Sequence, residues 1–452
     1  MGIPFFILFV IVLLFGVFIV DAQTMLILLG AFFIGIGITR CLNKSQKKYT
    51  TKVFSILFLA SSAYMVACYL FMIDKGFQYL FAWDTFVDFV PMNEYYLEQG
   101  SYRQILSSIW GNYHFFDRYS VGYFTYSTLW GLLARSINAN LYVTLQISTL
   151  FLYSFIGVII YRLFIKCKFI INKAFKYTII ISLCSIVFFY STIILRDIHI
   201  ALLYLIAIYL TFNSKFSIPT LTKLIIIALI TGTFRIESGL FLFVSIPLYL
   251  LLSIQKSKYK IAVFSVSTAI IIFLGFFYLK NKVIIDQVYV ANREAYITTN
   301  QGSGITGTLS KIPIIGDIAL IFFNSLQPIP FTSRLNSSNP STEFGAAVDN
   351  IMRFPQSISA LFNWMVVFYL LSWVFSNKMR KATSDRIPKA LKYNLWAGLL
   401  FFLLQSSVIS QRRLIPYYIV YYILFLIIYS SLKSDEKKHY NVISMFGFFI
   451  LQ

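Results

Sequence analysis

The pattern of hydrophobic and polar positions is that of a chain that crosses a membrane many times. Long apolar runs alternate with short polar segments along the sequence. Because a helix of about 20 apolar residues spans the hydrocarbon core of a bilayer, the runs predict about twelve transmembrane helices. These predicted spans lie near residues 4–22, 24–40, 53–73, 141–161, 177–194, 198–213, 221–234, 239–254, 261–279, 356–376, 394–410 and 414–431.

Two polar excursions between the predicted spans are long, residues 74–140 and 280–355. Each contains an apolar stretch that is too short or too interrupted to cross, 119–135 and 312–325, and we expect interfacial helices there. The fold class that follows is all-α. The whole chain, 1–452, is expected to be a single polytopic integral membrane domain with two long outer loops.

Composition agrees with a membrane protein and argues against other classes. The chain is 58% hydrophobic and only 12% charged, whereas soluble domains carry about 25% charged residues. The net charge of +21 would suggest a nucleic-acid partner in a soluble protein, but here the charges lie in loops between apolar runs, so no nucleic acid is expected. Residues 2–20 lack the features of a cleaved signal peptide and are expected to form a retained span. Residues 441–452 are apolar but too short to cross.

Lysine placement predicts the orientation of the chain. Lysine clusters follow the second, fourth, sixth, eighth, tenth and twelfth predicted spans. All these clusters therefore fall on one side, which the positive-inside rule makes cytoplasmic. Both termini are accordingly expected in the cytoplasm.

Arginine placement is the opposite of lysine placement. Ten of the fourteen arginines fall in outer loops or at outer span ends, compared with only four of the 24 lysines. The guanidinium group binds phosphate and carboxylate oxygens in a bidentate manner and stays charged. We therefore expect an anionic ligand at the outer face. The ten outer arginines are Arg103, Arg118, Arg135, Arg196, Arg235, Arg293, Arg334, Arg353, Arg412 and Arg413.

The start of the first excursion is the most acidic part of the chain. Asp84 and Asp88 are four residues apart, so on a helix their carboxylates share one face. Such a pair can act as a general base, orient an acceptor hydroxyl or hold a metal. The alternative is that both are solvated acids that pair with Lys75 or Arg103.

Three arginine clusters lie at predicted outer span ends. They are Arg196-Asp197-Ile-His199, Arg235-Ile-Glu237 and Gln411-Arg412-Arg413. An ionisable side chain at membrane depth costs about 2.5–3.5 kcal/mol on insertion scales, so it is usually paired or functional. The alternatives are that each arginine in the first two clusters neutralises its own neighbour, and that the third contacts anionic lipid.

Motifs for zinc or nucleotide-triphosphate chemistry are absent. The sequence has no CxxC, no HExxH and no glycine-rich phosphate loop. No cofactor is therefore expected, and a divalent metal held by the aspartates stays an open alternative.

With these features together, the chain resembles the bacterial oligosaccharide repeat-unit (O-antigen) polymerases of the Wzy type. These proteins are grouped with the polytopic C-type glycosyltransferases that use polyprenyl-linked sugars. The resemblance covers the architecture of most of the chain, with its dozen spans, two long outer loops and outer arginines. Family members carry an Arg-x(10)-Gly pattern in their large periplasmic loops. Arg293 to Gly304 and Arg334 to Gly345 fit it, but both lie in the second loop. Asp84 and Asp88 are instead similar to the first-loop acid of C-type transferases, which leaves the subtype open.

The resemblance implies a function at the periplasmic face of the bacterial inner membrane. The substrate would be an undecaprenyl-pyrophosphate-linked oligosaccharide, and the growing chain would move from its carrier to a new lipid-linked unit. Membrane lipid, a chain-length regulator and a flippase are the implied partners. Asp84, Asp88, Arg196 and Arg235 are the implied catalytic residues. The implied substrate-binding residues are Arg103, Arg118, Asp197, Glu237, Arg293, Arg334, Arg412 and Arg413.

Two other functions remain open from the sequence. A C-type transferase would add a single sugar from a polyprenyl-phosphate donor to a lipid or glycan. A lipid-linked oligosaccharide flippase would show internal repeats and charges around a midplane cavity. We find no repeat, and the charges lie at span ends, which favours a transferase.

Overall fold

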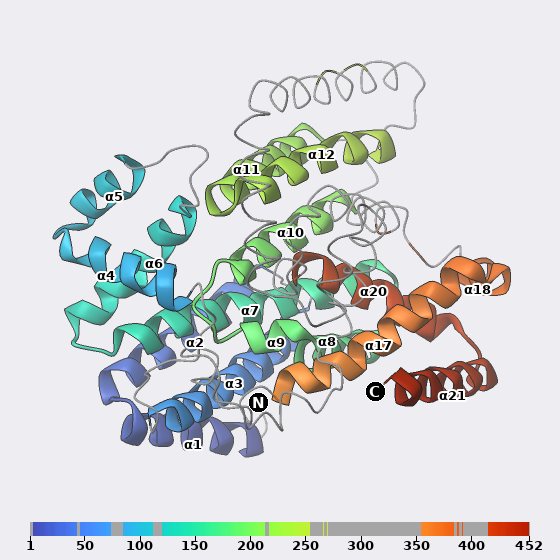
Figure 1. Cartoon of the computed structure of the whole chain (residues 1–452), viewed down its shortest axis with the longest axis horizontal. Helices are drawn as coiled ribbons and strands as arrows, with labels where there is room; N and C mark the ends of the chain where they lie inside the picture. The colour runs from blue at the N-terminus through green and yellow to red at the C-terminus, as the bar shows by residue number, and fades with distance from the viewer. Residues whose placement is uncertain are drawn as a thin grey trace, which may run out of the picture. The chain divides into compact units, whose positions relative to one another are not determined.

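The computed structural model contains only helices as regular elements in the part of the chain that it describes (Figure 1). This agrees with the all-α class. The described residues are 3–42, 46–73, 85–111, 120–212, 217–253, 265, 269, 354–383, 387, 391 and 415–451.

Four of the described helices are long and apolar enough to cross a membrane. They are Ala22–Cys41, Lys47–Ile73, Leu141–Lys166 and Phe354–Phe375. Their positions match four predicted spans, and the chain is consistent with a polytopic membrane protein. The predicted number of about twelve spans is not confirmed, because several described apolar helices are shorter. The predicted spans 261–279 and 394–410 lie almost wholly outside the described residues.

The chain forms two compact units. The first comprises Met1–Leu205, Thr233–Ile236 and Phe331–Phe362, and the second comprises Ile206–Gly232, Glu237–Pro330 and Asn363–Gln452. In chain order the helices are α1 Ile3–Ile19, α2 Ala22–Leu42, α3 Lys47–Ile73, the π-helix η1 Thr85–Phe89, α4 Val90–Glu98, α5 Tyr102–Gly111, α6 Val121–Ser136, α7 Leu141–Lys166, α8 Ile171–Cys184, α9 Ile186–Tyr190, α10 Asp197–Thr211, α11 Ile218–Phe234, α12 Ile236–Ser253, α17 Phe354–Phe375, α18 Asn377–Thr383, α20 Ile415–Ser431 and α21 Ser434–Leu451.

Helices α3 and α7 form the centre of the first unit. They pack closely at Gly157, where a Cβ atom would lie 2.0 Å from Cδ1 of the buried Leu57. The start of α7 is fixed by Asn140, whose side chain accepts a hydrogen bond from the Val143 amide at 3.1 Å. Asp21, just before α2, accepts one from the Asn140 amide at 3.2 Å. The first turns of α2 and α7 are therefore tied together at one end of the unit.

The described part of the first excursion is helical and is bound to this centre. The sequence predicts a helix over 119–135, and α6 lies at this position. Ser127 donates to Asn93 of α4 at 2.6 Å, and Tyr142 of α7 donates to the Glu94 carboxylate at 2.6 Å. These contacts hold α4 and α6 against α7. Glu94 is thus a structural acceptor.

The prediction of one continuous span over 177–194 is wrong. Helix α8 ends at Cys184, Ser185 is extended, and α9 ends at Tyr190. Residues 191–196 are not helical, although Ser191 to Leu195 are all buried. Ser191 Oγ donates to the Phe188 carbonyl at 2.6 Å, and such local bonds compete with the helical ladder. Hydropathy does not detect this break, because Ser191 and Thr192 are only weakly polar and stand between apolar residues.

Within the second unit, α17 and α20 run side by side in the same direction. Tyr422 donates to Asn363 at 2.7 Å, and the ring of Tyr369 lies 5.3 Å from Phe425 and 5.6 Å from Tyr429. The residue numbers of the contacting pairs therefore increase together along the two helices, which means that the helices are parallel. This agrees with the predicted topology, in which spans 356–376 and 414–431 cross in the same sense.

Candidate functional site

The candidate site is built on the buried, non-helical segment 191–196. Backbone groups of such a segment must find partners inside the protein, because a membrane interior supplies none. The Gln146 side chain of α7 donates to the Thr192 carbonyl at 2.7 Å, and Thr85 of η1 donates to the Ile194 carbonyl at 3.3 Å. Two polar side chains from distant parts of the sequence thus hold the segment that ends at Arg196.

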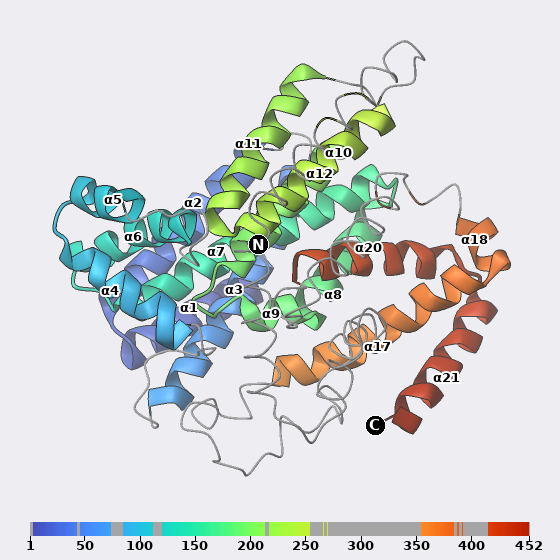
Figure 2. The same ribbon diagram turned by 45° about the horizontal axis from the view of Figure 1, so that its top comes forward.

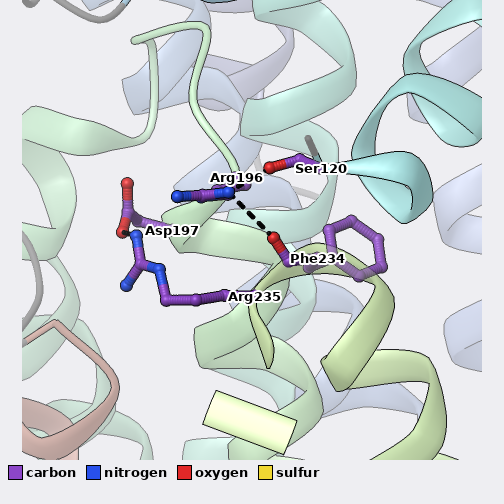
Figure 3. A network of polar contacts seen from close by, with 5 residues as sticks. All are labelled: Ser120, Arg196, Asp197, Phe234 and Arg235. Atoms are coloured by element: carbon purple, nitrogen blue, oxygen red, sulfur yellow. Dashed lines mark hydrogen bonds and ion pairs between the residues drawn. The ribbon is translucent and has the colours of Figure 1, made fainter. Parts of the chain in front are cut away.

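Arg196 joins four parts of the first unit. Its Nη1 donates to Ser120 Oγ, at the start of α6, and to the Phe234 carbonyl at 3.1 Å (Figure 3). Its Cζ lies 5.9 Å from the centre of the Phe89 ring. The side chain is half-buried. The guanidinium group is therefore held in one place by η1, α6 and the end of α11.

Arg235 forms a buried ion pair with Asp197. Its Nη2 lies 2.8 Å from Asp197 Oδ1, and both side chains are buried. The alternative that Arg235 is neutralised by its own neighbour is wrong, because Arg235 pairs with Asp197 at the start of α10 and Glu237 is exposed. Arg235 is the single non-helical residue between α11 and α12. This sharp turn is possible because Gly239 packs against Gly232, where a Cβ would lie 2.5 Å from the Gly232 Cα.

The charges of this cluster favour an anion. The cluster contains two guanidinium groups and one carboxylate, so the three side chains carry a net positive charge. Each arginine also immediately precedes a helix, α10 or α12, and the free amides at a helix N-terminus attract negative charge. The buried Arg235 Nε has no hydrogen-bond partner among the described residues. A buried donor without a partner costs about 1–3 kcal/mol, so this N–H group fits an oxygen of a ligand.

An aromatic box of three rings packs around His199, in the first turn of α10. The rings of Tyr123 and Tyr126 meet it nearly edge-on at 5.3 and 4.9 Å, and the Phe234 ring lies at 5.3 Å. Burial raises the pKa of both tyrosines of α6 well above the ordinary phenol value. Both phenols are therefore neutral at physiological pH. His199 is therefore a packing residue, and it contacts Phe234 next to Arg235.

The structure brings some of the predicted site residues together. Asp88 is exposed on η1, between Thr85 and Phe89, which contact the Arg196 segment. Arg103 is exposed on α5. Sequence reasoning missed Ser120, Thr85, Phe89, Gln146 and the aromatic box. The predicted site residues outside the described part of the chain are Asp84, Arg118, Arg293, Arg334, Arg412 and Arg413.

Neither the described side chains nor comparison with known proteins indicates a metal or a family for this cluster. Among the described residues, no group of three or more His, Cys, Asp or Glu side chains is placed to hold a metal ion. No protein-family model, curated protein or solved structure matches the chain significantly.

Replacing Asp197 by alanine is expected to lower the free energy of unfolding by about 3–5 kcal/mol, because it leaves the Arg235 charge buried without its partner. SDS titration of the purified protein in mild detergent would measure this change. Replacing both Asp197 and Arg235 by leucine should recover part of the loss. Glu436→Gln breaks the exposed pair with Lys378 and should leave the unfolding midpoint unchanged. Equal stability of wild type and Asp197→Ala would contradict the buried pair.

Proposed function

We propose that the chain is a glycosyltransferase of the bacterial inner membrane that polymerises undecaprenyl-pyrophosphate-linked oligosaccharide units at the periplasmic face. The observation that carries this proposal is the pair Arg196 and Arg235. Arg235 pairs with the Asp197 carboxylate, and Arg196 is bonded to the carbonyl of Phe234, the residue before Arg235. The two arginines directly precede α10 and α12. A preorganised positive site of this kind suits a substrate whose leaving group is a diphosphate.

In the proposed reaction, the two arginines stabilise the departing diphosphate. The bond between the anomeric carbon of the growing glycan and its undecaprenyl diphosphate breaks, and negative charge builds on the phosphate oxygens. Donors that are already fixed need no rearrangement at that moment. Arg196 is fixed by Ser120 and Phe234, and Arg235 by Asp197. Arg235 Nε is the donor that we assign to a phosphate oxygen.

The acceptor in this proposal is the hydroxyl at the non-reducing end of a new lipid-linked unit. Its oxygen forms the new bond to the anomeric carbon, and its proton passes to Asp88 or Asp84. Both substrates are anchored in the same membrane, so proximity contributes to the rate. Arg103, Arg118, Glu237, Arg293, Arg334, Arg412 and Arg413 are proposed to contact the sugar or phosphate groups.

Reconstitution tests the proposal directly. The full chain is placed in liposomes with one chemically defined undecaprenyl-diphosphate oligosaccharide, and the products are separated by size. A ladder of multiples of the repeat unit is expected, and liposomes with the Arg196→Ala protein serve as the control. Addition of one sugar from a polyprenyl-phosphate donor, without a ladder, would favour the single-sugar transferase. Movement of the unit across the bilayer without a new glycosidic bond would favour a flippase.

A further inference from the structure

Helix α21 (Ser434–Leu451) has a charged half and an apolar half. Its first turns carry Asp435, Glu436, Lys437 and Lys438. From Val442 onward the helix is apolar except for Ser444. Val442, Phe446 and Phe449 are each 68% exposed, and their spacing of four and three residues places them on one face. The opposite face is buried. A large apolar stripe in the second unit thus has no protein covering it among the described residues.

The buried face of α21 packs along α17 in the opposite direction. Tyr369 donates to Asn441 at 2.6 Å, and Trp364 donates to the Ser444 carbonyl at 2.7 Å. The ring of Phe448 then lies 6.4 Å from Trp364. Moving forward along α21 therefore means moving backward along α17, and the two helices lie alongside each other (Figure 2).

The charged end of α21 lies at the lysine-rich end of α17. Lys378, just after α17, forms an ion pair with Glu436 at 2.8 Å. Lys437 lies 5.2 Å from the ring of Tyr429, near the end of α20. Lysines gather where α17 and α20 end, which is the side that the charge pattern predicts to be cytoplasmic.

The depth that α21 reaches follows from its contacts with α17, a candidate membrane span. Trp364 is eleven residues before the end of α17 at Phe375. At 1.5 Å per residue this corresponds to about 16 Å, or half of a hydrocarbon core of about 30 Å.

We propose that α21 enters the leaflet on the lysine-rich side beside α17 and reaches the middle of the bilayer. Its exposed face, Val442, Phe446 and Phe449, then contacts lipid acyl chains, while Asp435 to Lys438 stay among the headgroups. A helix lying flat on the membrane surface would cross a spanning helix at a steep angle. The contacts of α21 instead follow the axis of α17 over more than one turn.

Depth measurements on the full chain in liposomes test this inference. The four cysteines are replaced by alanine, and a single cysteine carrying an environment-sensitive fluorophore is placed at Lys438, Val442, Phe446 or Phe449. Quenching by lipids with bromine or nitroxide at different depths then locates each label. The label should lie progressively deeper from Lys438 to Phe449, over about 16 Å. Leu371 and Phe375, exposed on α17, provide reference depths on a candidate span.

Equal shallow depths at all four positions would overturn the proposal in favour of a surface helix. Labels shielded from every quencher would overturn it in favour of a protein partner. A second measurement does not depend on the cysteine-free protein. A photo-crosslinking amino acid replaces Phe446 or Phe449 in the otherwise unchanged chain, and lipid adducts are expected by mass spectrometry. Adducts with protein alone would contradict contact with acyl chains.

Discussion

Replacing Asp88 by asparagine is expected to lower the rate of glycosyl transfer about 10²–10⁴-fold, the usual contribution of a general base. Asparagine keeps the size and one acceptor oxygen but cannot take the acceptor's proton. Asp88 lies on η1, whose Thr85 binds the Ile194 carbonyl and whose Phe89 ring faces Arg196. Its backbone is therefore held next to the proposed diphosphate site. Turnover is measured with the reconstituted protein, and donor binding is measured separately.

Donor binding should survive this change, because the arginines are untouched. Asp84→Asn, tested in parallel, shows which of the two carboxylates acts as base. Glu98→Gln is the matched control, since Glu98 is an exposed acid at the end of α4. Full activity of both aspartate variants would remove this acidic segment from the mechanism.

Arg196→Lys is expected to lower turnover about 10²–10³-fold although the charge is kept, a loss of the size seen when one transition-state donor is removed. A lysine has a single ammonium group on a flexible stem and cannot reproduce the planar fork. Arg196 Nη1 already serves Ser120 and the Phe234 carbonyl. A lysine that satisfied these two acceptors would have no second nitrogen for the phosphate.

Arg235→Lys should have a similar effect, because Nη2 is used by Asp197 and Nε is the donor assigned to the ligand. Arg135→Lys is the matched control. Arg135 is exposed at the end of α6 and donates to the Leu97 carbonyl at 2.9 Å, away from the cluster. Membrane abundance must be equal in all variants. Wild-type turnover of both cluster variants would exclude the arginines from catalysis.

Hydropathy correctly predicted the helices that are long, apolar and unbroken. Helices α2, α3, α7 and α17 begin and end within about six residues of the predicted spans, because span length and loop charge determine them. The prediction of two arginine clusters was informative for a related reason. Charges at the ends of apolar runs are costly unless they are paired or used, and Arg235 does pair with Asp197.

The arrangement of the cluster could not be read from the sequence. Arg235 pairs with Asp197 from another part of the chain, whereas the charge pattern points only to neighbours along the sequence. The break at 191–196 begins inside an otherwise apolar run, so a hydropathy scan does not detect it. Its supports, Thr85 and Gln146, are single polar residues whose partners are backbone carbonyls. Nothing in their local sequence points to those partners.

The ion pair between Arg235 and Asp197 has a consequence for biogenesis. Arg235 is synthesised 38 residues after Asp197. The Asp197 carboxylate is therefore made before the arginine that neutralises it. A lone charge that entered the bilayer early would oppose insertion by about 2.5–3.5 kcal/mol. Helices α10 and α12 are therefore expected to pass from the translocon into lipid as one group, after α12 has been synthesised.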